Sequence, residues 1–265
     1  ITIAEDSGEA TVNLAGISAG GGEAQPLRVT AVSANTNLIS TPSVIYTSAE
    51  PTGTLKFSPI ADQSGSTTVT VTVEDGGEDN DLGTADDNLK IARTFEVTVT
   101  PVNDLPTLAS LDNVVIAEDY GVKTIDLSGI RAGANEQQEL KVTATSSNSD
   151  LLHSPVVEYT SAASAGKLKL TPKPDQSGTS TITVTVEDAG LDNDLSTTSD
   201  NATYSQTFEL NVTALNDRPT LDAPADITIA EDSGEATVNL AGISAGGGEA
   251  QPLRVTAVSA NTNLI

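Results

Sequence analysis

TVTVTV at residues 68–73 alternates a β-branched polar residue with a β-branched apolar residue. A period of two is typical of a strand whose valines face a core and whose threonines face water. The stretch TITVTV at residues 181–186 has the same pattern, 113 residues further along the chain. A further alternating segment carries Phe95, Val97 and Val99. These patterns predict an all-β fold.

The spacing of 113 residues is the period of an internal repeat. Residues 1–39 recur letter for letter as residues 227–265, and residues 1–113 and 114–226 share 59 identical positions without a gap. A fixed period of this kind indicates stacked copies of one structural unit. The sequence starts at Ile1 without Met and ends within a third repeat, so we expect it to be a segment of a longer array.

Each repeat has room for seven short strands, separated by turn signals rich in Gly, Pro, Asp and Ser. Besides the two alternating stretches, the first repeat has strand-like runs at residues 1–4, 10–14, 27–33, 44–47 and 54–57. Seven strands in about 100 residues are typical of an immunoglobulin-like or cadherin-like sandwich. We predict tandem seven-stranded β-sandwiches in a linear array, with repeats at 1–104 and 105–217 and the N-terminal part of a third at 218–265.

Composition argues against several classes of partner. The formal net charge of −25, from 37 acidic and 12 basic residues, disfavours nucleic acid and anionic membranes. No run of apolar residues is long enough to insert into a membrane. The sequence contains no Cys, which removes disulfides, Cys–zinc sites and thiol nucleophiles. Aromatic residues make up only 3% of the sequence. A core low in aromatic residues and under strong like-charge repulsion needs another source of stability, and a bound divalent cation is the candidate.

Antiparallel strands would gather the acidic loops at the ends of a sandwich. The loops after the first and fifth strands and the C-terminal linker share one end, and the next domain would present its sixth loop there. Carboxylate and amide oxygens suit Ca²⁺, which takes six to eight oxygen ligands, and without metal these carboxylates would repel one another. We therefore predict Ca²⁺ as the cofactor. The candidate ligands are Glu5, Asp6, Asp62, Glu74, Asp75, Asp79, Asn80, Asp81, Asp87, Asn103, Asp104, Glu118, Asp119, Asp175, Glu187, Asp188, Asp192, Asn193, Asp194, Asp200, Asn216, Asp217, Glu231 and Asp232.

The sixth loop, residues 75–88, is a second candidate site and is longer than most hairpin loops. Its motif Asp79-Asn80-Asp81 returns as Asp192-Asn193-Asp194. The loop is not an EF-hand, because it lacks the Gly at the sixth position and the closing Glu. Several alternatives stay open: an ion of its own, ligands lent to the joint, both of these, or an acidic surface that is only solvated.

The two linkers carry a family resemblance. Asn103-Asp104-Leu105-Pro106 and Asn216-Asp217-Arg218-Pro219 resemble the linker signature of cadherin-type repeats, where an Asn-Asp pair before Pro binds interdomain Ca²⁺. Glu5 lies where that family places an N-terminal Glu ligand, whereas Asp62-Gln63-Ser64 replaces its Asp-Arg-Glu motif. The whole unit is similar to the cadherin-like and Ig-like tandem repeats of giant bacterial surface proteins and adhesins. The resemblance implies calcium-dependent extender domains.

The repeats and the resemblance together favour a structural extender or fibre segment with joints made rigid by Ca²⁺. Its expected location is extracellular, on the bacterial cell surface. Its expected partners are neighbouring repeats of the same chain, with lateral contacts to other copies in a fibre. The alternative is an adhesive binding module for carbohydrate or homotypic contact, which the scarcity of aromatic residues disfavours. We do not expect an enzyme, because a repeat array would duplicate the active site and no constellation of His, Cys and Ser supports one.

Overall fold

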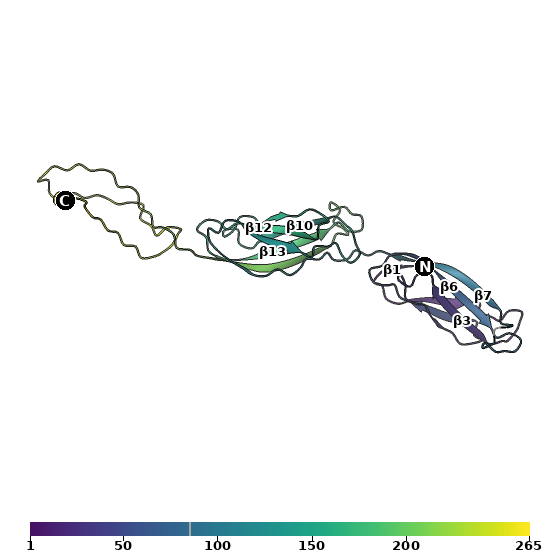
Figure 1. Cartoon of the computed structure of the whole chain (residues 1–265). Coiled ribbons are helices and arrows are strands. Elements are labelled where there is room, and N and C mark those ends of the chain that lie inside the picture. The colour runs from purple at the N-terminus through teal and green to yellow at the C-terminus, as the bar shows by residue number, and fades with distance from the viewer. Residues whose placement is uncertain (85) are drawn as a thin grey trace. The chain divides into compact units, whose positions relative to one another are not determined.

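The computed structural model describes residues 1–84 and 86–265, and within these residues every regular element is a β-strand. The prediction of an all-β fold is therefore confirmed. No helix that is long and apolar enough to cross a membrane occurs in the described part of the chain. Arrows in Figure 1 mark the strands. The chain divides into two compact units. The first comprises Ile1–Leu105, Ala132–Glu139 and Asp188–Ala202, and the second comprises Pro106–Arg131, Leu140–Glu187 and Thr203–Ile265.

Seven strands of the first repeat form two sheets. One sheet has the order β1-β7-β6-β3 and the other has the order β2-β5-β4. The strands are β1 (Thr2–Ala4), β2 (Ala10–Ala15), β3 (Leu27–Ser33), β4 (Ser43–Ile45), β5 (Thr52–Phe57), β6 (Gly65–Asp75) and β7 (Lys90–Thr100). All neighbouring strands are antiparallel except β1 and β7, which run parallel with Thr2 opposite Thr98.

The core of this repeat lies between its two sheets. Val69 of β6 and Val97 of β7 are fully buried and belong to one cluster with Leu55 and Phe57 of β5. The alternation in β6 explains why its valines can reach this core, since successive side chains of a strand point to opposite faces. Further along the same strand, however, Val73 is only half-buried.

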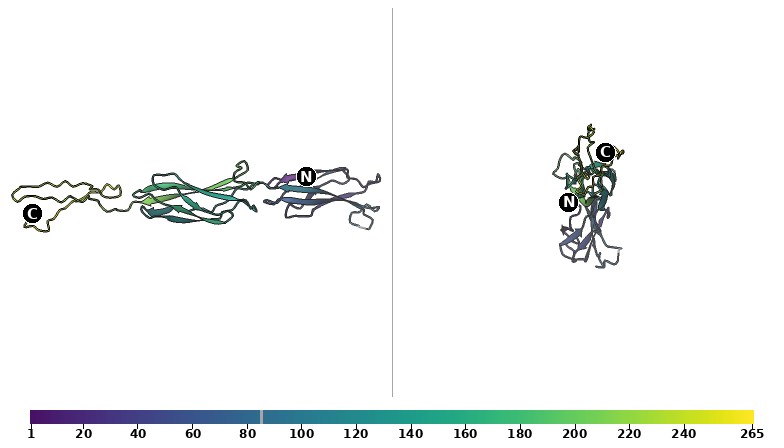
Figure 2. Two further views of the ribbon diagram at one scale, coloured as in Figure 1. Left: turned by 90° about the horizontal axis from the view of Figure 1, so that it is seen from above. Right: turned by 90° about the vertical axis from the view of Figure 1, so that its left-hand side faces the viewer.

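The second repeat builds the same pair of sheets, with orders β10-β13-β14-β8 and β11-β12-β9. Figure 2 shows its strands lying in two layers. The strands are β8 (Val114–Ala117), β9 (Lys123–Ser128), β10 (Leu140–Ser146), β11 (Val156–Glu158), β12 (Ala165–Leu170), β13 (Gly178–Asp188) and β14 (Thr203–Thr213). Here the alternating valines Val184 and Val186 of β13 are both fully buried.

The long strands extend beyond the alternating stretches that predicted them. β6 and β7 pair from Gly65 opposite Val99 to Glu74 opposite Lys90. The ladder continues because backbone pairing needs no apolar side chain. Pairing also begins directly after the predicted linker that ends at Pro106, where Thr107 forms an isolated bridge with Arg131. The compact units cut across the repeats, so the domain boundaries after residues 104 and 217 stay predictions.

Candidate metal centre

Three aspartates of the first unit converge from separate parts of the chain. Asp6 follows β1, Asp62 follows β5 and Asp104 follows β7, and one carboxylate oxygen of each lies within 4.8 Å of the others. Asp6 and Asp62 each have a φ of 58°, in the left-handed region that Asp tolerates better than most residues. The Asp62 amide donates a 3.3 Å hydrogen bond to Asp6 Oδ1. The sequence prediction that these loops meet is thus matched by the geometry.

A second group of carboxylates lies beside this trio and is more deeply buried. Glu5 is buried, and its Oε1 accepts a 2.9 Å hydrogen bond from the Val102 amide. The Asp104 amide donates a 3.2 Å hydrogen bond to Glu136 Oε2. Asp188, at the end of β13, is 0% exposed. Because a buried carboxylate is costly unless it is paired, this group requires compensation.

Hydrogen bonds link Asp188 to the linker residues. The Asn103 side-chain amide donates a 3.2 Å bond to Asp188 Oδ1, and Gln138 Nε2 donates a 2.6 Å bond to Asn103 Oδ1. Asp188 Oδ1 also accepts from the amides of Gly190 at 3.0 Å and Ala202 at 2.9 Å. One oxygen of Asp188 thus binds both the loop after β13 and Asn103 of the linker.

Four further oxygens of this region have no hydrogen-bond partner within the described chain. They are Asp104 Oδ2, Glu136 Oε1, Gln138 Oε1 and Asp188 Oδ2, and all four are buried. Buried polar atoms in proteins are almost always satisfied, so each such atom points to an absent partner. Oxygen atoms of this kind are the ligands that a hard cation such as Ca²⁺ prefers.

The electrostatics of the site agree with this description. Burial, together with the nearby charges of Asp104, Asp188 and Glu5, raises the pKa of Glu136 to about 7. Burial and the charges of Asp62, Asp6 and Glu5 likewise raise the pKa of Asp104. The Asp104 amide opposes the shift at Glu136 by stabilising the charged carboxylate. The carboxylates therefore repel one another and would gain from a neutralising cation.

Two residues of the site, Glu136 and Gln138, were missed by the sequence analysis. Both lie in the segment Ala132–Glu139, which contains no acidic run to attract notice. A signal was nevertheless present, because Glu23, Glu136 and Glu249 are separated by the repeat period of 113.

The second unit contains the same arrangement one period later. Asp119, Asp175 and Asp217 bring carboxylate oxygens within 4.8 Å of one another. The Asp217 amide donates a 3.3 Å hydrogen bond to Glu249 Oε2, as Asp104 does to Glu136. Asp217 Oδ2 is buried without a partner, and burial and the charge of Asp175 raise the pKa of Asp217. Glu118 is buried, and its Oε1 accepts a 2.6 Å bond from the Leu215 amide.

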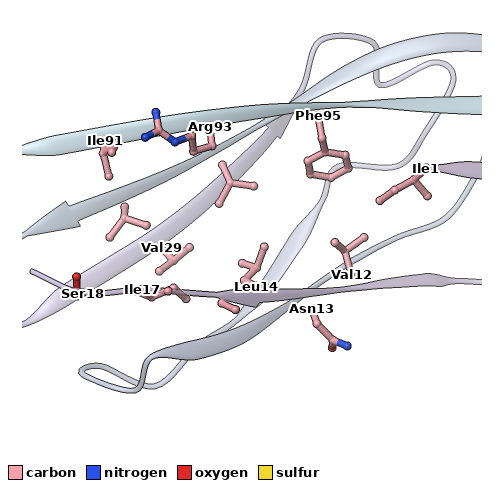
Figure 3. Close-up of a pocket in the computed structure, with 14 residues that line it drawn as sticks. Ile1, Val12, Asn13, Leu14, Ile17, Ser18, Val29, Ile91, Arg93 and Phe95 are labelled. Carbon is pink, nitrogen blue, oxygen red and sulfur yellow. The ribbon is translucent and has the colours of Figure 1, made fainter.

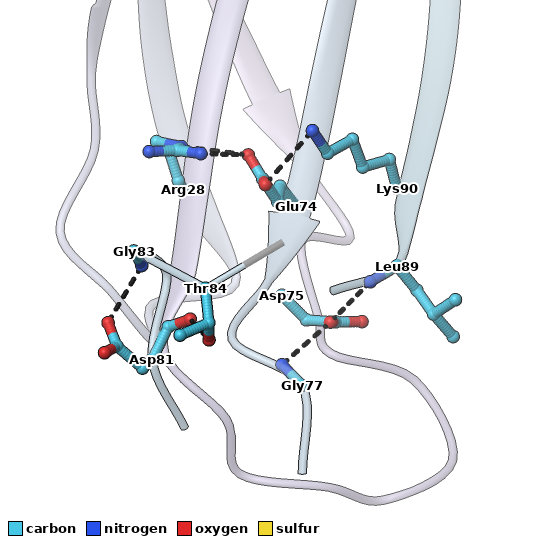
Figure 4. Close-up of polar contacts among 9 residues, drawn as sticks. All are labelled: Arg28, Glu74, Asp75, Gly77, Asp81, Gly83, Thr84, Leu89 and Lys90. Carbon is cyan, nitrogen blue, oxygen red and sulfur yellow. Dashed lines mark hydrogen bonds and ion pairs between the residues drawn. The ribbon is translucent and has the colours of Figure 1, made fainter. Parts of the chain in front are cut away.

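The sixth loop of the first repeat is braced mainly by its own carboxylates. Asp75 Oδ1 accepts from the amides of Gly77 at 3.1 Å and Leu89 at 2.8 Å (Figure 4). Asp79 Oδ1 accepts from the Asp81 amide at 2.9 Å and its Oδ2 from the Thr84 hydroxyl at 2.7 Å, which lowers the pKa of Asp79. Both oxygens of Asp79 thus have partners in the absence of any ion.

The sixth loop of the second repeat repeats this bracing and adds one contact. The Asp194 amide donates a 2.9 Å bond to Asp192 Oδ1, and Asn193 Oδ1 accepts a 2.7 Å bond from the Glu139 amide. Asp200 Oδ2 accepts from the Leu191 amide at 2.9 Å, whereas its Oδ1 is buried without a partner within the described residues. The geometry therefore favours a bracing role for the Asp-Asn-Asp motif, and the choice between an ion of the loop's own and ligands lent to the joint stays open.

The remaining predicted ligands lie elsewhere. Both oxygens of Glu74 are engaged, Oε2 with Arg28 and Oε1 with Lys90 at 3.1 Å (Figure 4), and Glu187 pairs with Lys141 at 3.0 Å. Ion pairing of this kind does not favour a metal at either residue. The other predicted ligands outside the two clusters are Asn80, with a φ of 59°, Asp87, which accepts from the Glu78 amide, Asn216, which bonds to the Asp217 carbonyl, and the exposed Glu231 and Asp232.

Comparisons with known proteins give weak similarities only. Neither a family model nor a curated protein matches the chain. Among solved structures, domains 4 and 5 of the S-layer protein SbsC match with a TM-score of 0.33 and 18% identity over 70% of each chain. The human desmocollin-1 ectodomain matches with a TM-score of 0.37 and 12% identity, over 83% of this chain and 41% of that one. An endo-fucoidan hydrolase of glycoside hydrolase family 107 also matches, with a TM-score of 0.28 and 17% identity, over 81% of this chain and 28% of that one. No functional argument rests on similarities at this level.

Proposed function

We propose that this chain is a structural extender segment of a bacterial cell-surface protein, and that Ca²⁺ stabilises its acidic clusters. The observation that carries the proposal is the group of buried, unpartnered oxygens on Asp104, Glu136 and Asp188. These residues, with Glu5, would hold the ion. The bound ion would supply positive charge at these oxygens, which have no hydrogen-bond donor among the described residues.

The position of the ligands explains how one ion would stiffen the array. Glu5 and Asp104 belong to the first repeat, whereas Glu136 and Asp188 belong to loops of the second repeat that are part of the first compact unit. An ion shared by these carboxylates ties segments from two repeats together. Without it, the same carboxylates repel one another and weaken the connection.

The stabilisation expected from the ion is large on the scale of one domain. At a free Ca²⁺ concentration 100 times the dissociation constant, one site contributes about 2.7 kcal/mol. For a domain of this size, about 1 kcal/mol corresponds to roughly 4–8 °C in the unfolding midpoint. Calcium modules that work outside cells bind with dissociation constants of about 10⁻⁴–10⁻³ M, which agrees with the proposed location.

The first test is thermal unfolding of the full chain in 5 mM CaCl₂, in 5 mM MgCl₂ and in excess EDTA, at one ionic strength. With dissociation constants in that range, 5 mM Ca²⁺ gives about 1–2 kcal/mol per site, so we expect the midpoint to rise by about 4–18 °C in Ca²⁺ relative to EDTA. A smaller rise is expected in Mg²⁺, which demands stricter octahedral geometry and gives up its water reluctantly. Equal midpoints in Ca²⁺ and EDTA would reject the metal centre.

The extender role needs a separate test, because a stabilising ion alone does not show stiffening. Small-angle scattering of the full chain gives its largest dimension with and without chelator. We expect the chain to be longer and less variable in Ca²⁺. The same distribution of lengths in both conditions would reject the stiffened extender even if the midpoint rises.

A further inference from the structure

The first repeat contains an apolar groove between its two sheets, with a volume of about 540 Å³. Figure 3 shows Leu14 and Ile17 on one side of it and Phe95 and Ile91 on the other. Val73 of β6 also lines the groove. A cavity of this size and lining is large enough for several side chains of another segment.

The second repeat has the same residue at seven of the fourteen lining positions, and it buries several of these more deeply. Leu14 and Val73 are half-buried in the first repeat, whereas their equivalents Leu127 and Val186 are 1% and 0% exposed. Phe95 is likewise half-buried, and its equivalent Phe208 is buried. These three residue pairs are identical, so the difference in their exposure comes from what packs around them.

In the second repeat the extended stretch Pro-Thr-Leu-Ala at residues 106–109 lies beside Gly129, the equivalent of the lining residue Gly16. The Thr107 amide donates to the Arg131 carbonyl at 2.9 Å, and the Arg131 amide donates back to the Thr107 carbonyl at 3.4 Å. The Ala109 amide donates to the Ser128 carbonyl at 2.9 Å. Leu108, between these contacts, is 5% exposed. The segment thus adds an edge to the end of β9 and buries one leucine.

The glycine at the end of this edge confirms where the segment lies. A Cβ added to Gly129 would meet the Ala109 amide nitrogen at 3.2 Å. A Cβ added to the equivalent Gly16 would meet nothing within 4 Å. The space beside Gly16 is therefore the place that residues 106–109 fill one period later.

The same pairing begins the third repeat. Thr220 forms a bridge with Ser244, with hydrogen bonds of 3.0 and 3.4 Å, and the Asp222 amide donates to the Ala241 carbonyl at 2.9 Å. Pro-Thr-Leu at residues 219–221 is identical to residues 106–108. In both places the linker of one repeat supplies the edge of the repeat that follows it.

We propose that the groove of the first repeat is a docking surface for the linker of a repeat on its N-terminal side, an extended Pro-Thr-Leu segment. The segment pairs with the backbone of residues 15–18 and places its leucine among the lining residues. Main-chain hydrogen bonds hold the segment against residues 15–18, and its leucine side chain anchors it in the groove. Other peptides that add a strand to the edge of a sheet bind in the same way. The repeats are therefore completed in order along the array, each by the linker before it.

Residues 219–226, PTLDAPAD, provide the natural probe. They precede residues 227–265, which are identical to residues 1–39. Adding this octapeptide in front of Ile1 of the full chain should slow hydrogen exchange of the Ser18 amide by about tenfold or more, because a bonded amide exchanges only on opening. The amides of Arg131 and Ser244, which already donate to Thr107 and Thr220, serve as internal references.

The matched control is the same extension with its leucine replaced by aspartate. It keeps the backbone and the length but cannot bury its anchor, so we expect Ser18 to exchange as in the chain without extension. Fast exchange of Ser18 with both extensions would overturn the proposal. So would slow exchange of Ser18 in the chain without extension, together with a dimer in sedimentation, because a second copy would then be the occupant.

This proposal does not rest on the metal centre. The acidic residues of the two carboxylate clusters do not line the groove. The exchange experiment is done in EDTA and in CaCl₂, and the protection of Ser18 is expected in both. If Ca²⁺ does not change the unfolding midpoint, protection of the Ser18 amide can still confirm that the linker docks in the groove. If the Ser18 amide stays unprotected, a rise of the midpoint in Ca²⁺ can still confirm the metal centre.

Discussion

The Asp104 amide donates a hydrogen bond of 3.2 Å to Glu136 Oε2, although the two side chains repel each other. The bond satisfies one oxygen of Glu136, and its other oxygen is buried without a partner. The backbone thus holds two carboxylates at close range. Such an arrangement is unfavourable by itself and becomes favourable once a cation is bound, which makes Glu136 a sensitive position for testing the site.

Replacing Glu136 by Gln should have opposite effects with and without Ca²⁺. In EDTA the midpoint should rise, because a neutral side chain removes the repulsion from Asp104 and Asp188. In titrations, Ca²⁺ binding should weaken by about tenfold, or roughly 1.4 kcal/mol, because one charged ligand is lost. The control is Glu23→Gln, since Glu23 is the exposed equivalent in the first repeat. Equal effects of the two substitutions would contradict the assignment.

The stability of the metal-free chain should depend on pH with a definite sign. The pKa of Glu136 is raised from its ordinary value near 4.5 to about 7, so the folded state binds this proton more tightly than the unfolded state. Stability contributed in this way is present at low pH and is lost as pH rises through about 7. We expect the midpoint in EDTA to fall between pH 5 and pH 8. The fall should be smaller in the Glu136→Gln variant, and an unchanged slope there would assign it to other groups.

Glu74 should behave differently from the metal-centre carboxylates. Its ion pairs with Arg28 and Lys90 lower its pKa, chiefly through the hydrogen bond from Arg28. Glu74→Gln should therefore lower the midpoint by the same amount in EDTA and in CaCl₂. A loss of Ca²⁺ affinity in this variant, measured by calorimetry, would restore Glu74 to the list of ligands.

Leu108 should contribute to stability as a core residue, although it lies only two residues after the predicted linker that ends at Pro106. Leu108→Ala should cost about 2–5 kcal/mol in the second repeat, as large-to-small substitutions in cores do. Leu221→Ala removes the same side chain from the same Pro-Thr-Leu motif at a position that is 50% exposed, and should change stability by less than about 0.5 kcal/mol. Chemical denaturation of both variants gives the comparison. Similar costs at the two sites would mean that Leu108 does not act as an anchor.

The sequence was sufficient to predict the strands, because alternation reports directly which face of a strand is buried. It located β6 and β13 through their valines but ended them too early, since backbone pairing continues through polar residues such as Glu74. It also placed Asp6, Asp62 and Asp104 at one end of the sandwich. That prediction needed only the antiparallel order of the strands.

The parts that were not predicted depend on contacts that no local pattern reveals. Glu136 is a single acidic residue in a polar loop, and its role depends on meeting Asp104 and Asp188 in space. The segment Pro101–Pro106 was interpreted as a linker because Pro marks a break, and the pairing and packing of the three residues after Pro106 were not predicted. In both cases the residues recur at equivalent positions of the repeats, and comparing those positions could have drawn attention to them.

The parallel pairing of the first and last strands has a mechanical consequence. In the first repeat the chain enters through β1 and leaves through β7, and the two strands run side by side in the same direction with Ile3 opposite Val99. Pulling the two ends of the repeat apart slides one strand along the other, so their hydrogen bonds are loaded together in shear and are not opened one by one. β8 and β14 have the same geometry, with Ile116 opposite Val212. Each repeat therefore resists tension along the chain at this parallel pair of strands.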